Sequence, residues 1–258
     1  MILNARLPFA PWVDFTRRRL PGVMPLARAD WLLISDSYAA QMAERARLLT
    51  ERPADVLACL PQAQAAAAEL LDAVLHDLPA LGFTMTQGHA TCPDGRAVAL
   101  DRDQPLRTLG LLLQEDFCIL QKPEGAVEHI LTGAVLCFPS SWTLSEKLGK
   151  PLLRIHMPVA SYDTQMGARV QRMFDAIRPE QPLWRANLLR YTNPALYQPR
   201  PEFAPKDKRD GGDFIRSERQ CLLRLPVSRT VVFSIHTAQI NRSDLRPQEA
   251  QALARIES

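Results

Sequence analysis

Apolar residues recur at helical spacing through the first part of this chain. Two segments show the pattern clearly: residues 36–49, which follow a candidate N-cap at Asp36, and residues 62–78, which follow Pro61. The second segment contains four consecutive alanines, the residue with the highest helix propensity. The pattern therefore predicts a largely helical N-terminal region that ends near Gly82.

Beyond Gly82 the apolar positions predict strands with short helices between them. The predicted strands cover residues 117–121, 130–138, 183–191, 214–225 and 230–238. The predicted helices cover residues 106–114, 144–148 and 163–177, with a last one beginning at Pro247. A proline-rich connection, residues 192–212, is long enough to predict a functional lid or a mobile excursion. Helices followed by antiparallel strands indicate the α+β class rather than alternating βαβ units.

Composition narrows the classes of protein to consider. The chain has 258 residues, of which 47% are hydrophobic and 23% charged, as in an ordinary globular domain. No apolar run approaches the ~20 residues of a membrane span, and no hydrophobic segment follows Arg17, Arg18 and Arg19 to make a secretory signal. A net charge of +3 is too small to indicate a nucleic-acid partner. Five cysteines without paired spacing indicate reduced thiols and a cytoplasmic protein.

Cofactor motifs are absent from the sequence. It contains no G-x-G-x-x-G, no Walker loop, no G-x-S-x-G and no H-E-x-x-H. The spacing of His89 and Cys92 suits two metal ligands, but a surface loop explains the same residues better. Redox chemistry would therefore need a cofactor bound in another way, and electrons from a partner.

His156 stands in a strand-like run with apolar residues on both sides, from Leu152 to Val159. A neutral imidazole in such surroundings needs one partner for its N–H and leaves the other nitrogen free to bind iron. From the residues alone, a core histidine with its hydrogen bond satisfied remains the favoured interpretation over a metal ligand.

Two predicted strands carry polar side chains at alternate positions. In one, alternation places Arg216, Glu218, Gln220 and Arg224 on the same face, which either lies in solvent or lines a polar cavity; solvent is the favoured interpretation. In the other, Arg185 shares a face with Asn187. Arginine suits bidentate contacts to carboxylates, but ion pairing within the sheet explains Arg185 equally well.

An ordered set of motifs resembles the family named for the haem-dependent oxidative N-demethylase alpha subunit. The motifs lie between residues 15 and 238, and their order makes the resemblance specific. They are residues 133–138 followed by Pro139-Ser140-Ser141-Trp142, Glu146-Lys147-Leu148-Gly149, Ile155-His156-x-Pro158-Val159, Pro182-x-Trp184-Arg185-x-Asn187, and Arg216-x-Glu218-Arg219-Gln220 with Arg224-Leu225-Pro226.

The resemblance implies a PAS-like antiparallel sheet with helical additions that binds a b-type haem through one histidine. It implies a single domain over residues 1–258, with a helical lobe at 1–82, a haem-binding core at 83–240 and a tail helix at 241–258. The implied reaction uses dioxygen to demethylate a small secondary amine, and it yields the shortened amine and formaldehyde. Electrons would come from partner reductase subunits that carry flavin, NADPH and an iron–sulfur centre.

Carried onto this sequence, the resemblance makes His156 the iron ligand. Arg185 and Arg216 become candidates for the haem propionates or the polar rim of the pocket. Glu218 becomes the counter-charge of the substrate ammonium. Met157 and Cys137 are the rival iron ligands. Two other functions stay open: a non-catalytic module that senses haem or a small ligand, and an interaction protein that has lost the cofactor.

Overall fold

The computed structural model describes residues 1–13, 22–159, 162–205 and 212–257. Arg17, Arg18 and Arg19, and residues 206–211 of the predicted 192–212 connection, lie outside the described residues. No helix among the described residues is long and apolar enough to cross a membrane.

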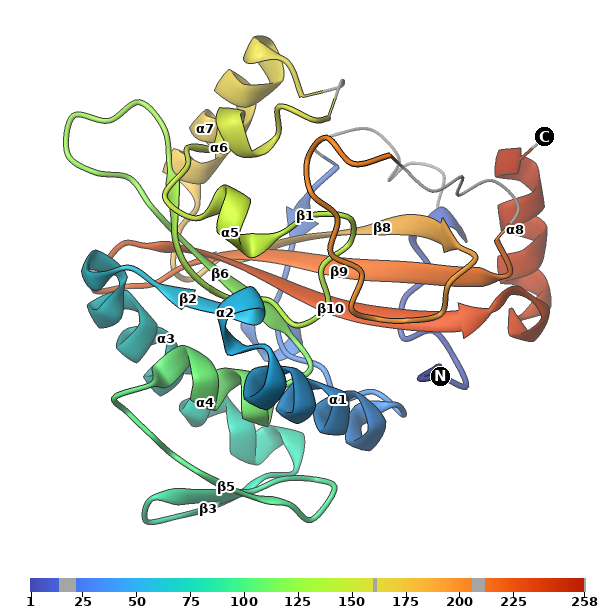
Figure 1. Cartoon of the computed structure of the whole chain (residues 1–258), viewed down its shortest axis with the longest axis horizontal. Coiled ribbons are helices and arrows are strands. Elements are labelled where there is room, and N and C mark those ends of the chain that lie inside the picture. The colour runs from blue at the N-terminus through green and yellow to red at the C-terminus, as the bar shows by residue number, and fades with distance from the viewer. Residues whose placement is uncertain (14–21, 160–161, 206–211, 258) are drawn as a thin grey trace.

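A seven-stranded antiparallel sheet forms the centre of the molecule (Figure 1), in the strand order β1-β8-β9-β10-β6-β7-β2. Its strands are β1 (Met24–Pro25), β2 (Leu57–Cys59), β6 (Asp116–Gln121), β7 (Ile130–Val135), β8 (Leu183–Tyr191), β9 (Phe214–Arg224) and β10 (Val231–Asn241). A small second sheet contains β3 (Thr84–Thr86), β4 (His89–Thr91) and β5 (Ala97–Ala99). Strands β8, β9 and β10 are the long central ladder.

Helices cover both faces of the large sheet (Figure 1). One face carries α1 (Tyr38–Glu51), α3 (Gln64–Asp77) and α4 (Pro105–Leu112), and the other carries α5 (Leu144–Lys147), α6 (Leu152–Ile155) and α7 (Thr164–Ala176). The remaining helices are α2 (Pro53–Val56), α8 (Pro247–Glu257) and the 3-10 turns η1 (Pro11–Val13), η3 (Arg28–Asp30), η4 (Pro61–Ala63), η5 (Leu78–Leu81) and η6 (Arg242–Asp244).

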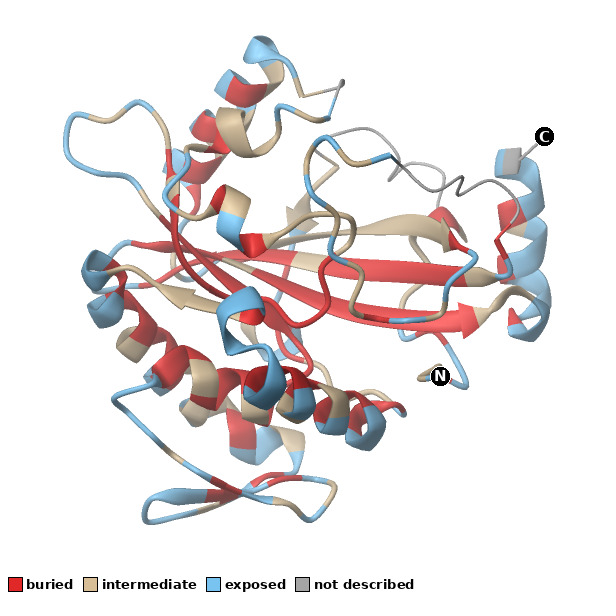
Figure 2. Ribbon diagram, in the orientation of Figure 1, coloured by how far each residue is buried: buried red, intermediate tan, exposed pale blue. Residues whose placement is uncertain are grey.

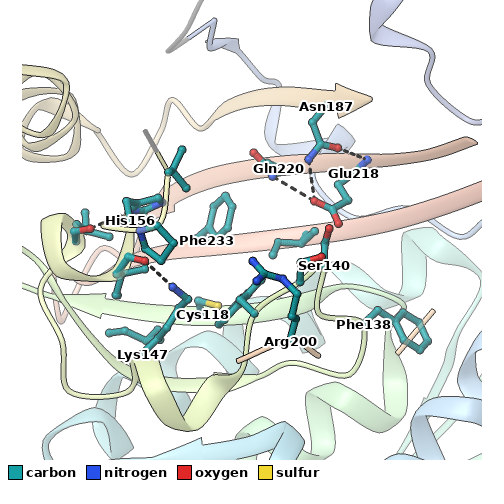
Figure 3. A pocket seen from close by; sticks show the side chains of 18 of the residues that line it. Cys118, Phe138, Ser140, Lys147, His156, Asn187, Arg200, Glu218, Gln220 and Phe233 are labelled. Carbon is teal, nitrogen blue, oxygen red and sulfur yellow. Dashed lines mark hydrogen bonds between the residues drawn. The ribbon is translucent and has the colours of Figure 1, made fainter. Parts of the chain in front are cut away.

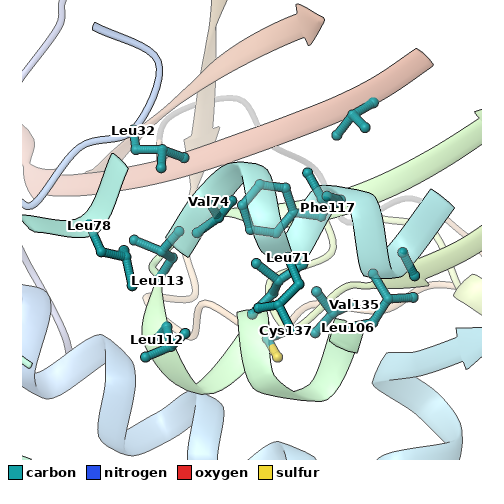
Figure 4. Packing of buried hydrophobic residues seen from close by; sticks show 14 of the residues in the cluster. Leu32, Leu71, Val74, Leu78, Leu106, Leu112, Leu113, Phe117, Val135 and Cys137 are labelled. Atoms are coloured by element: carbon teal, nitrogen blue, oxygen red, sulfur yellow. The ribbon is translucent and has the colours of Figure 1, made fainter. Parts of the chain in front are cut away.

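Alternation along the strands separates two apolar cores. Phe117, Ile119 and Leu223 pack with α1, α3 and α4 in the larger core, whose centre Figure 4 shows. Cys118 and Leu120 point to the other face and pack with α5, α6 and α7. The large core is the more extensive of the two (Figure 2), and the second face carries a smaller core with a cavity beside it.

Close approach fixes α4 against the sheet. A Cβ added at Gly110 would lie 2.7 Å from Cγ2 of Val135, so only glycine lets the helix backbone approach β7 this closely.

A buried ion pair ties α1 to the start of β6. Nη1 of Arg45 lies 2.6 Å from Oδ1 of Asp116, and the side chains are 0% and 1% exposed. Asp116 also accepts hydrogen bonds from the backbone N–H groups of Cys137 and Phe138, at 2.7 and 2.9 Å. Arg45 donates in addition to three backbone carbonyls, so no charge in this cluster lacks partners.

The structure confirms the predicted α+β class and large antiparallel sheet. The long strands and the helices α1, α3 and α7 occur where the periodicity placed them, and Asp163 caps α7 by accepting a hydrogen bond from the Met166 N–H. Asp36 is not an N-cap: Ser37 holds that position, and Asp36 instead binds Asn4 and the backbone N–H groups of Ala5 and Arg6.

The N-terminal region is a mixture of helices and strands. Besides α1 and α3, it supplies β1 and β2, which pair with β8 and β7 of the large sheet. The three short strands of the second sheet, which periodicity did not predict, follow at residues 84–99. A strand of three residues has too few alternating apolar and polar positions to be recognised from the sequence.

Candidate functional site

A cavity of about 640 Å³ lies on the less packed face of the large sheet (Figure 3). Its floor is formed by side chains from β6, β7, β8, β9 and β10. Its cover is formed by residues 138–142, α5, α6 with the residues that follow it up to Val159, and residues 200–202. The volume lies within the roughly 300–1,000 Å³ of pockets that bind small molecules and cofactors. One end is mainly apolar apart from Lys147, and the other is polar and charged.

His156 lines the apolar end, directly after α6 rather than in a strand. Its Nδ1 lies 2.8 Å from the Leu152 carbonyl oxygen, so Nδ1 carries the proton that it donates there. Nε2 is therefore unprotonated and available as a metal ligand. The Tyr162 ring stacks on the imidazole, with centroids 4.1 Å apart and planes 15° from parallel, which holds the ring in one orientation.

Burial lowers the pKa of the His156 imidazole below its usual value. The neutral form, which has the free electron pair on Nε2, is thus the form present at pH 7. The other histidines make contacts of a different kind: His129 binds Gln171 and His236 binds Glu115, while His76 pairs with Asp77 and His89 lies exposed in β4.

Neither predicted rival of His156 lines the cavity. Met157 is 53% exposed on the outside of the molecule, and Cys137 is buried in the large core on the opposite face of the sheet. Cys118 does line the cavity, but burial and, to a smaller extent, Asp116 raise the pKa of its thiol well above the usual range. A thiol that stays protonated is a poor iron ligand.

Cys118 should resist alkylation while the protein is folded. The protonated thiol is a weak nucleophile, so iodoacetamide at pH 8 should leave Cys118 unmodified and should modify it only after unfolding in urea. Peptide mass spectrometry measures the modification. Cys59, a half-buried thiol outside the cavity, is the comparison: burial raises the pKa of its thiol as well, but its partial exposure should let it react faster than Cys118 in the folded protein. Equal reaction of both thiols in the folded state would contradict the expectation.

Glu218 lies at the charged end and is 5% exposed. Its Oε1 accepts a hydrogen bond from Nε of Arg216 at 3.1 Å, and Oε2 accepts one from Nδ2 of Asn187 at 2.8 Å. The Glu218 backbone N–H donates to Oδ1 of Asn187 at 2.9 Å, so the Asn187 amide is locked in place. These contacts orient one carboxylate rigidly at the floor of the cavity.

Arg216 lies behind Glu218 and is completely buried. Its guanidinium donates to Glu218, to the Leu196 carbonyl at 2.9 Å and to the Phe138 carbonyl at 2.5 Å. Arg216 is not one of the residues that line the cavity, so it holds Glu218 and the two covering segments together. The face that Arg216 and Glu218 share was predicted to lie in solvent, and that prediction is wrong because the covering segments bury it.

Three cationic side chains line the cavity: Lys147, Arg185 and Arg200. Lys147 lies 3.7 Å from Glu202, which also pairs with Arg154 at 3.0 Å, and so the covering loop is fastened to α5 and α6. Arg185, on β8, forms no hydrogen bond or ion pair with any residue that the structure describes. Nε of Arg200 is buried and has no hydrogen-bond partner among the same residues.

Sequence reasoning missed Lys147, Arg200 and Glu202 as cavity residues. The family motif Glu-Lys-Leu-Gly contains Lys147, so the motif was a signal that could have identified it. Arg200 and Glu202 belong to the proline-rich connection that was predicted to be a functional lid or a mobile excursion, and nothing in its sequence singled out these two residues. Only the folding of that connection over the sheet brings them to the cavity.

The arrangement offers one histidine nitrogen rather than a cluster of metal ligands. Among the described residues, no group of three or more His, Cys, Asp or Glu side chains could hold a metal ion. A metal site at His156 would therefore need ligands that the metal brings with it. A model of the family described as "Haem-dependent oxidative N-demethylase, alpha subunit-like" matches residues 22–257, nearly the whole chain.

Proposed function

Since the chain belongs to the haem-dependent oxidative N-demethylase alpha subunit-like family, we propose that it is the haem-binding subunit of an oxidoreductase that demethylates a small secondary amine. One observation supports this most directly. His156, whose Nε2 is free, lines a cavity whose other end holds the oriented carboxylate of Glu218. The first group suits an iron atom and the second suits a cationic amine.

The residues of the cavity fit a b-type haem. His156 would hold the iron, and Leu120, Leu131 and Phe233 would contact the apolar porphyrin. The propionates need cations, and the unpartnered Nε of Arg200 is a donor without another role. Arg185 is the second candidate on the rim. Arg216 would act indirectly, since its donors are already used by Glu218 and the covering segments.

When bound, haem would supply the reduction of dioxygen and the oxidation of the N-methyl group. The chain's own residues would bind and orient the amine. Glu218 would attract the ammonium group, and Arg216 and Asn187 would keep its carboxylate from turning away. The covering segment around Glu202 would keep bulk water from the reacting atoms.

The rest of the proposal concerns architecture and partners. The described chain would form one PAS-like domain whose haem-binding core is residues 83–240. Helices α1, α3 and α4 would cover the face of the sheet opposite the haem. As the family resemblance implies, electrons would come from reductase subunits with flavin, NADPH and an iron–sulfur centre, which agrees with the lack of motifs for these groups in this sequence.

A reconstitution tests the proposal. Haemin added to the purified protein should give a Soret band at one equivalent, and a reductase with NADPH should then release formaldehyde when a secondary amine is added. A Soret band without amine-dependent formaldehyde would indicate the sensing module instead. Failure to bind haemin would overturn the proposal.

Glu218→Gln should weaken amine binding and leave haem in place. A hydrogen bond to a charged group contributes about 1.5–3 kcal/mol, so removing the carboxylate charge should raise the amine KM by about tenfold or more. The KM comes from formaldehyde release, and the Soret band reports the haem. Ser140→Ala, which changes a neutral side chain in the same cavity, should leave the KM nearly unchanged. An unaltered KM in Glu218→Gln would remove Glu218 from the amine site.

A further inference from the structure

Two opposite charges share the polar end of the cavity. Arg185 and Glu218 lie on the neighbouring antiparallel strands β8 and β9, and both line the cavity. The register pairs Arg185 with Gln220 and Asn187 with Glu218, so Arg185 and Glu218 are diagonal neighbours on one face. Such neighbours are about 7–8 Å apart, which is within reach of a single small molecule.

Arg185 and Glu218 form no hydrogen bond or ion pair with each other. Glu218 takes its hydrogen bonds from Arg216, Asn187 and Gln220, the last at a long 3.5 Å. Arg185 forms no hydrogen bond or ion pair with any described residue, although it is half-buried. The Glu218 carboxylate acts on Arg185 only through space, without a hydrogen bond or an ion pair. A half-buried guanidinium with no hydrogen-bonded counter-charge is costly, so the geometry favours an anion from outside the described chain.

Gln220 supplies a third group between them. Its Nε2 faces Glu218, and its Oε1 accepts no hydrogen bond from the described residues. A secondary ammonium has two N–H donors. Glu218 and the Gln220 carbonyl oxygen are two acceptors on the same strand face that match these donors.

We propose that the amine substrate is a zwitterion, a small N-methylated amino acid whose ammonium binds Glu218 and Gln220 and whose carboxylate binds Arg185. The inference rests on the proposed function and names its substrate class. The N–CH3 bond breaks, and one oxygen atom of dioxygen leaves in formaldehyde and the other in water. The partner reductase supplies the two electrons, and two protons come from solvent. The product is the demethylated amino acid.

The rival anion for Arg185 is a haem propionate. Both anions are carboxylates, so the contact alone does not separate them. They differ in what an Arg185 variant loses: either the preference for a carboxylate-bearing amine or the affinity for haem.

Calorimetry on the haem-reconstituted protein tests the inference, with N-methylglycine and dimethylammonium as the two ligands. The native protein should bind N-methylglycine at least about tenfold more tightly, since a charged hydrogen-bonded contact contributes about 1.5–3 kcal/mol. Arg185→Gln should abolish the preference and leave the haem affinity unchanged. Arg102→Gln removes the same charge at an exposed position outside the cavity and should keep the preference.

Three outcomes would overturn the inference. They are equal affinity for the two ligands in the native protein, an unchanged preference in Arg185→Gln, or a fall in haem affinity as the only effect of that variant. The last would assign Arg185 to a propionate and leave the proposed function standing. If the native protein binds no haem, the proposed function fails, and the same titrations on the haem-free protein still decide whether Arg185 selects a carboxylate.

Discussion

His156→Ala should abolish the Soret band of the reconstituted protein at micromolar haemin. His156 is the one histidine that lines the cavity among the described residues, and its Nε2 is free because Nδ1 donates to Leu152. Loss of a residue that only hydrogen-bonds to a metal ligand lowers metal affinity by about 10–100-fold. Loss of the ligand itself should therefore lower haem affinity by more than ~100-fold. Haemin titration followed by absorbance measures the affinity.

Two further variants separate a ligand from a residue needed for folding. His156→Gly leaves a space of imidazole size beside Tyr162, and added imidazole should restore the Soret band there. Met157→Ala alters the adjacent, exposed side chain and should bind haem as the native protein does. A native spectrum in His156→Ala would remove His156 as the ligand and leave the cavity without its proposed role.

Asp116→Ala should destabilise the protein by about 3–5 kcal/mol, the usual result of breaking a buried ion pair from one side. The substitution leaves the fully buried guanidinium of Arg45 without its counter-charge. It also removes the acceptor for the backbone N–H groups of Cys137 and Phe138, which lead into the cover of the cavity. Urea unfolding followed by circular dichroism measures the free energy of unfolding.

An exposed ion pair provides the matched control for Asp116. Asp72 pairs with Arg102 at 2.6 Å, but the two side chains are 57% and 63% exposed. Asp72→Ala should therefore cost less than about 1 kcal/mol. Asp116→Asn keeps one acceptor oxygen and should lie between the two, which gives a measurable value if Asp116→Ala does not fold. Equal losses for Asp72→Ala and Asp116→Ala would show that burial of the pair contributes nothing.

The local hydrophobic period was sufficient to predict the long helices and strands of the fold. Helices α1 and α3 and strands β8, β9 and β10 each span enough residues for their period to stand out, and all five appear where it placed them. Several short elements were not predicted correctly, because each spans too few residues to show a period. Helix α6 has a single turn, so its apolar residues resembled a strand and His156 was placed in one.

For the site, the sequence by itself determined which residue types were present and which faces they shared. Alternation put Glu218 beside Gln220 and Arg185 beside Asn187, and the apolar setting singled out His156. It could not decide whether these faces met solvent or a cavity, because alternation is the same in both cases.

Only the tertiary structure decided that question. Residues 138–142 and 196–202, distant in sequence from β9, cover its polar face and are held there by Arg216 and by the Glu202 ion pairs. The same packing left Arg185 facing a cavity without a partner among the described residues, and gave His156 the Leu152 carbonyl that frees its Nε2. Long-range contacts, which no local period encodes, turned a set of polar residues into a site.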